Sequence, residues 1–86
     1  MGLDSVELLM ECEEHFEIKL SDKEAGNCHR VQDLVNIVCS KLLENGMRAN
    51  PDVIFREVQD LTARQLGLKK EKIKRDSLFV KDLGLS

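Results

Sequence analysis

Few side chains in this 86-residue sequence have the types or the spacing that chemistry requires. The two histidines, His15 and His29, lie among charged residues on different segments, and no nucleophile or metal ligand accompanies either at a usual spacing. The cysteines are odd in number, widely separated and lack a Cys-x-x-Cys pair, which argues against a disulfide framework and against a zinc site. They are Cys12, Cys28 and Cys39. We therefore expect no enzyme, no metal centre, and a reducing, cytoplasmic compartment.

Ser5 is a candidate of another kind, because it stands at the start of an apolar-periodic segment. Asp4 or Ser5 can cap a helix there, since each side chain carries an oxygen that accepts a backbone N–H group of the first turn. A structural role therefore explains Ser5 without any chemistry.

Apolar residues at helical spacing predict three long helices. They cover residues 4–16, a segment after Gly26-Asn27 that runs to about residue 43, and a segment that starts at Asn50-Pro51 and stops at Gly67. The expected core stripes are Leu3, Val6, Leu9, Met10 and Phe16; then Val31, Leu34, Val35, Val38 and Leu42; then Val53, Ile54, Val58, Leu61 and Leu66.

The segments between and after these helices are predicted to be irregular. Ile18 and Leu20 alternate with Lys19 as an extended linker, and Ser21-Asp22 opens a short turn. Residues 68–86 form a long loop, a feature that in a small domain usually has a functional reason. The apolar side chains expected to pin it are Leu68, Ile73, Leu78, Phe79, Val80, Leu83 and Leu85.

Charge is distributed unevenly around a net charge of −3. Residues 1–25 hold eight acidic and two basic side chains, whereas Lys69 to Arg75 hold five basic and one acidic. We interpret the basic run as a solvated loop rather than a phosphate-binding patch. It is short, and the chain has no Trp or Tyr for stacking, so we expect no nucleic-acid partner. No apolar run approaches the ~20 residues of a membrane span, and no secretory signal is visible.

Two stretches of the sequence resemble the acyl carrier protein family, in the reverse of the family's order. Residues 54–85 look like the family's first helix and long loop, and they include the phrase FVKDLG that leads into the prosthetic-group serine. Residues 3–42 are similar to the second, third and last helices, with VELLM, EEHF, DKEA and VQDLV matching in spacing.

This resemblance implies a single all-α domain, an acyl-carrier-like four-helix bundle of permuted connectivity. Three helices would be longer and one short, with one long loop. Residues 1–43 would supply the family's second to last helices, residues 44–52 a linker, and residues 53–86 the first helix and the long loop. Nine extended residues reach up to ~30 Å, enough to join the ends of so small a domain.

The resemblance also implies a non-enzymatic carrier for fatty-acid or polyketide-type synthesis. A serine at the start of the second helix receives 4′-phosphopantetheine from coenzyme A, and the terminal thiol holds acyl groups as thioesters. Family members usually read DLGxDSLDxVEL, and counting back from Val6 places the modified serine at Gly2. Ser5, with Asp4 in the local phrase GLDSV, and Ser86 are the alternatives, and loss of the modification is the third possibility.

The expected partners are fatty-acid or polyketide enzymes and a phosphopantetheinyl transferase. The acidic side chains of the first helix resemble the carboxylates with which carriers meet basic patches on these enzymes. They are Glu7, Glu11, Glu13 and Glu14. A solvated helix face explains the same residues without a partner.

Two alternatives stay open at this point. The chain could keep the fold and the acidic face as an interaction module without the prosthetic group, or be an engineered permutant for folding studies. It could also be a monomer or an intertwined dimer, in which residues 1–43 of one copy pack on residues 51–86 of another.

Overall fold

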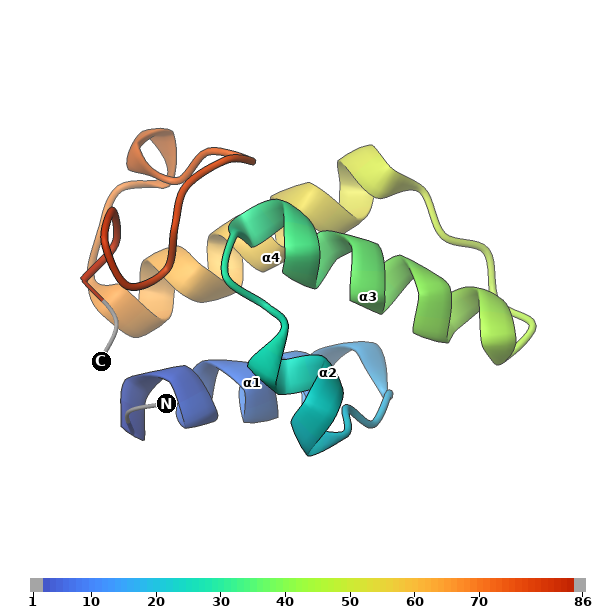
Figure 1. The fold of residues 1–86 in the computed structure, drawn as a ribbon. Coiled ribbons are helices and arrows are strands. Elements are labelled where there is room, and N and C mark those ends of the chain that lie inside the picture. The colour runs from blue at the N-terminus through green and yellow to red at the C-terminus, as the bar shows by residue number, and fades with distance from the viewer. Residues whose placement is uncertain (1–2, 85–86) are drawn as a thin grey trace.

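The computed structural model describes residues 3–84, and over this range it contains four α-helices and no β-strand (Figure 1). The helices are α1 (Leu3–Phe16), the short α2 (Asp22–Gly26), α3 (Val31–Glu44) and α4 (Pro51–Leu66). A long loop follows α4 and contains one 3-10 turn, η1 (Lys70–Lys72). The packing is centred on α4, which lies against both α3 and α1. The all-α bundle of three longer helices, one short helix and one long loop is therefore confirmed.

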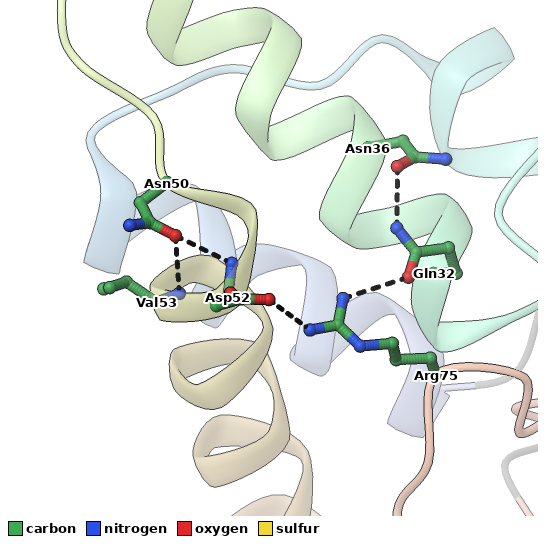
Figure 2. Close-up of polar contacts among 6 residues, drawn as sticks. All are labelled: Gln32, Asn36, Asn50, Asp52, Val53 and Arg75. Carbon is green, nitrogen blue, oxygen red and sulfur yellow. Dashed lines mark hydrogen bonds and ion pairs between the residues drawn. The ribbon is translucent and has the colours of Figure 1, made fainter.

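Local sequence signals set the helix ends. The Asn50 side chain accepts hydrogen bonds from the backbone N–H groups of Asp52 and Val53, with Pro51 in the first helical position (Figure 2). Gly67 ends α4 in the left-handed conformation, at φ 67°, which glycine adopts at little steric cost. The predicted turn at Ser21 is in fact the start of α2, where Ser21 and Glu24 form a reciprocal capping box.

The core stripes of α3 and α4 match the sequence pattern, with one exception. All five predicted positions of α3 are buried, as are Ile54, Val58 and Leu61 of α4. Leu66 is partly buried against the same core. Val53 was predicted to face the core, but its side chain is exposed. It lies in the first turn of α4, next to the connector.

The apolar stripe of α1 differs from the prediction. Phe16 is buried as predicted and Leu9 packs partly against the core, but Val6 and Met10, also expected there, are exposed. Leu8 and Cys12 are buried in their place. These two residues are offset from Val6 and Met10 by two positions, or about 200° around a helix, so the two pairs lie on nearly opposite faces. Only the face with Cys12 turns toward the bundle.

The long loop is fixed to the start of α3 by backbone hydrogen bonds. The N–H groups of Val31 and Gln32 donate to the carbonyls of Ser77 (3.0 Å) and Arg75 (2.8 Å), and the Phe79 N–H donates to the His29 carbonyl (3.0 Å). The loop thus satisfies N–H groups that have no partner within the first turn of a helix.

Most of the apolar side chains that were predicted to anchor the loop to the core are buried or partly buried. Ile73, Phe79 and Leu83 are buried, and Leu68 packs partly on the core. Val80 was also predicted to pin the loop, but its side chain is exposed. Leu85 lies outside the described residues.

The Arg75 side chain also links the loop to two helices. Its guanidinium lies 2.7 Å from the Asp52 carboxylate on α4 and donates a long hydrogen bond, 3.4 Å, to Gln32 on α3 (Figure 2). The same group lies over the Phe55 ring, 4.4 Å from its centroid. Lys70 of the basic run pairs with Asp60 at 3.0 Å. The run is exposed, as expected of a solvated loop, but two of its cations are engaged in holding the loop to α4.

Candidate functional site

The candidate site is the first turn of α1, where the sequence places Asp4 and Ser5. Because α1 begins at Leu3, both residues lie inside the first turn and not at the predicted capping position. Backbone N–H groups in a first turn lack intrahelical partners and carry the positive end of the helix dipole. A phosphate on Ser5 would therefore be favoured there. Gly2 and Ser86, the other two loading positions, lie outside the described residues.

The face of α1 that follows Ser5 combines apolar and acidic side chains. Val6 is 42% exposed and Met10 is 53% exposed, and the two are one helical turn apart. Glu7, Glu11 and Glu14 are also exposed on this helix. The apolar part of this face was missed in the sequence, because Val6 and Met10 fit a core stripe as well as Leu8 and Cys12 do. Exposed apolar side chains rimmed by charge are typical of protein interaction sites.

The four candidate docking carboxylates are not equivalent. The Glu13 carboxylate accepts a hydrogen bond from the backbone N–H of Leu20 at 2.9 Å, so this side chain fixes the link between α1 and α2. Glu7 accepts one from the Gln65 amide on α4 at 2.8 Å. Glu11 and Glu14 have no such contact among the described residues and remain the clearest candidates for meeting a partner.

A shallow groove lies where α1 ends near the C-terminal half of α3. Its lining includes Glu14, Glu17, Lys41 and Glu44. Lys41 is paired with Glu24 at 3.0 Å, and the pKa of Glu24 is lowered, first by its hydrogen bond from the Ser21 backbone and then by Lys41. The groove is therefore lined mainly by charged side chains, one of which, Lys41, is already paired.

The histidines occupy structural positions. His15 Nε2 lies 3.5 Å from the Glu57 carboxylate on α4, and the ring meets Phe16 edge-on at 4.8 Å. His29 takes part through its backbone, whose N–H donates to Asp33 and whose carbonyl accepts from Phe79. Within residues 3–84 no group of three or more His, Cys, Asp or Glu side chains could hold a metal ion.

The three cysteines are free thiols, with Cys12 in the core and Cys28 and Cys39 packed against its edge. Burial raises the pKa of Cys12 to about 12 and that of Cys28 to about 11. The Cys28 thiol also donates to the Glu24 carbonyl at 3.4 Å. Because the thiolate is the reactive species, both are poor nucleophiles. Cys12 is completely buried and serves as a small hydrophobic residue of the core.

Comparison with known proteins supports the family resemblance. The acyl carrier protein of Buchnera aphidicola subsp. Acyrthosiphon pisum (strain 5A) is 43% identical to this chain over 43 residues. These residues make up 50% of this chain and 54% of that protein, so the chain spans about half the length of the curated relative it matches. No family model and no solved structure matches the chain. None of the helices between residues 3 and 84 has the length and hydrophobicity that a membrane crossing requires.

Proposed function

We propose that this chain, whose resemblance to acyl carrier proteins is supported over half its length, carries acyl groups on 4′-phosphopantetheine attached to Ser5. The single observation that carries the proposal is the position of Ser5. It lies in the first turn of α1, directly before an exposed face that is both apolar and acidic. As in the family, the role would be that of a carrier and not of an enzyme.

A permuted order of the family's elements agrees with three observations. Along the chain, two longer helices with a short helix between them come first. The connector, a further helix and the long loop follow. In Figure 1 the first turn of α1 and the red end of the loop lie at the same end of the molecule, where the family joins its loop to its second helix. A colinear alignment that stops at half of each protein is also what a swapped order predicts.

The first turn of α1 has the chemical groups that attachment of the prosthetic group would require. The Ser5 hydroxyl would form the phosphodiester, and the free N–H groups of the first turn would stabilise its negative charge. Once attached, the group supplies a thiol on a long flexible arm, and acyl groups bind to it as thioesters. The protein's own thiols would compete poorly for acyl groups, because burial raises the pKa of Cys12, Cys28 and Cys39 alike.

The exposed face of α1 would dock the partner enzymes. Glu11 and Glu14 would meet basic residues on a fatty-acid or polyketide enzyme or on the transferase, while Val6 and Met10 fill the centre of the contact. Complementary charge raises the encounter rate and makes it sensitive to salt. A cytoplasmic location would keep the three cysteines reduced.

Loading in vitro tests the proposal. The protein is incubated with coenzyme A and a broad-specificity phosphopantetheinyl transferase, and its intact mass is measured. We expect one added phosphopantetheine, lost in Ser5→Ala and kept in Ser86→Ala and in Ser40→Ala, a matched serine on the exposed side of α3. Loading that survives in Ser5→Ala would move the site elsewhere, and no loading at all would reject the carrier function.

A second candidate function is an interaction module of the same fold without the prosthetic group. The observation that favours it is Gly2 at the position where the family's register calls for serine. Such a protein would stay unmodified in the loading assay but would still bind carrier-protein enzymes in a salt-dependent manner. Charge reversal at Glu11 and Glu14 would abolish this binding.

A further inference from the structure

One short connector, residues 45–50, is the link between the two parts of the fold. α1, α2 and α3 precede it, and α4 and the long loop follow it. The buried face of α4 lies against α3 and α1, and the loop is bonded to the start of α3. Neither part therefore has a complete core by itself, and each needs the other to bury its apolar side chains.

The bend at this connector depends on the backbone of Gly46. Gly46 has φ 75°, its N–H donates to the Leu43 carbonyl (3.0 Å), and the Met47 N–H donates to the Leu42 carbonyl (2.9 Å). This pair of bonds is the Schellman arrangement that ends a helix and turns the chain away. If Gly46 leaves the left-handed region, the chain cannot keep this turn.

Apolar side chains are exposed on both sides of the connector. Leu43 is 62% exposed, Met47 49% and Val53 47%. They are half of the large exposed apolar side chains in the described part of the chain. Within residues 3–84 nothing covers them, although they stand next to the segment that would have to move if the two parts came apart.

We propose that the connector is the hinge of a domain-swapped dimer, in which residues 51–84 of each copy pack on α1, α2 and α3 of the other. Every contact between the two parts is kept in such a dimer, because the sequences are identical. Six extended residues reach about 20 Å, so two hinges can pass each other near the two-fold axis. That crossing places Leu43, Met47 and Val53 of both copies in one region, where they become buried. The inference does not depend on the proposed carrier function.

Complementation between two defective chains tests the exchange directly. Leu34 of α3 and Val58 of α4 are both fully buried. Leu34→Asp and Val58→Asp should therefore each place a charge in the core and prevent that helix from packing. Each variant alone should lose its helical circular dichroism. When the two are unfolded together and refolded, a swapped heterodimer contains one intact module, so about half of the wild-type helical signal should return. A mixture that stays as unfolded as its components would overturn the proposal.

The hinge itself is tested with the full chain by sedimentation over a wide range of protein concentration. A Cβ at Gly46 would meet no atom within 4 Å, so Gly46→Ala acts through φ alone. We expect it to lower the dimer dissociation constant by about tenfold or more, because each of two hinges is released from a disfavoured conformation. Leu43→Ser should raise the constant, while Val80→Ser, which removes an exposed apolar side chain in the loop, should not. A wild-type chain and a Gly46→Ala variant that both remain monomeric would contradict the proposal.

Discussion

Replacing Arg75 with alanine should loosen the long loop from the bundle. Its guanidinium pairs with Asp52 at 2.7 Å and lies 4.4 Å from the Phe55 ring centroid. The Asp52 side chain is mostly exposed, so the ion pair contributes about 0.2–1 kcal/mol. The cation–π contact at a partly exposed site adds about 0.5–1 kcal/mol. Together they predict a loss of about 0.7–2 kcal/mol in the free energy of unfolding.

Chemical and thermal unfolding followed by circular dichroism measure this loss. For a domain of this size, 1 kcal/mol lowers the melting temperature by roughly 4–8 °C. Arg75→Lys keeps the charge but loses the planar fork, so its loss should be intermediate. A double-mutant cycle with Asp52→Asn isolates the ion pair, and we expect a coupling of about 0.2–1 kcal/mol that falls with added salt.

Lys74→Ala is the matched control, because Lys74 is exposed in the same loop and forms no ion pair among the described residues. It should leave the melting temperature nearly unchanged. If Arg75→Ala is no more destabilising than Lys74→Ala, the contacts of Arg75 with Asp52 and Phe55 do not hold the loop. The backbone bonds to Val31 and Gln32 would then be sufficient to hold it.

Three further changes test separate parts of the structure. Glu17 has φ 55°, so Glu17→Gly should raise the free energy of unfolding by about 0.5–1 kcal/mol in urea titrations, and Glu17→Ala should not. Glu13→Ala should lower it by about 1 kcal/mol through loss of the bond from Leu20, whereas Glu14→Ala should leave it unchanged and weaken only partner binding. Burial raises the pKa of Cys12 from 9.0 to about 12, so above pH 9 the unfolded chain releases a proton that the folded chain keeps. Stability should therefore be constant below pH 9 with respect to this thiol and fall above it by up to about 1.4 kcal/mol per pH unit. Cys12→Ala should remove this thiol's share of the slope and leave the share of Cys28, whose pKa is also raised.

The sequence predicted α3 and α4 well because each has one apolar stripe and clear boundary residues. Asn45-Gly46, Asn50-Pro51 and Gly67 all mark ends that the structure contains. In α1 the pattern was ambiguous. Val6 and Met10 form one stripe and Leu8 and Cys12 another on the opposite side, and periodicity cannot tell which one faces the bundle.

The contacts of the long loop could not be predicted for a different reason. Val31 and Gln32 are capped by backbone carbonyls of the loop, and every residue has a carbonyl, so no residue type signals the contact. Arg75 stands in a basic run where its neighbours are solvated, and only the fold brings it to Asp52 and Phe55. The candidate serine and the acidic residues were visible in the sequence, but the exposed apolar part of the docking face was not.

The measurement that tests the carrier function most directly is the intact mass of the protein isolated from cells that contain a phosphopantetheinyl transferase, followed by peptide mapping. We predict a population heavier by one phosphopantetheine, with the added mass on the peptide that contains Ser5. A protein of unmodified mass, from cells that load an ordinary acyl carrier protein, would contradict the proposed function.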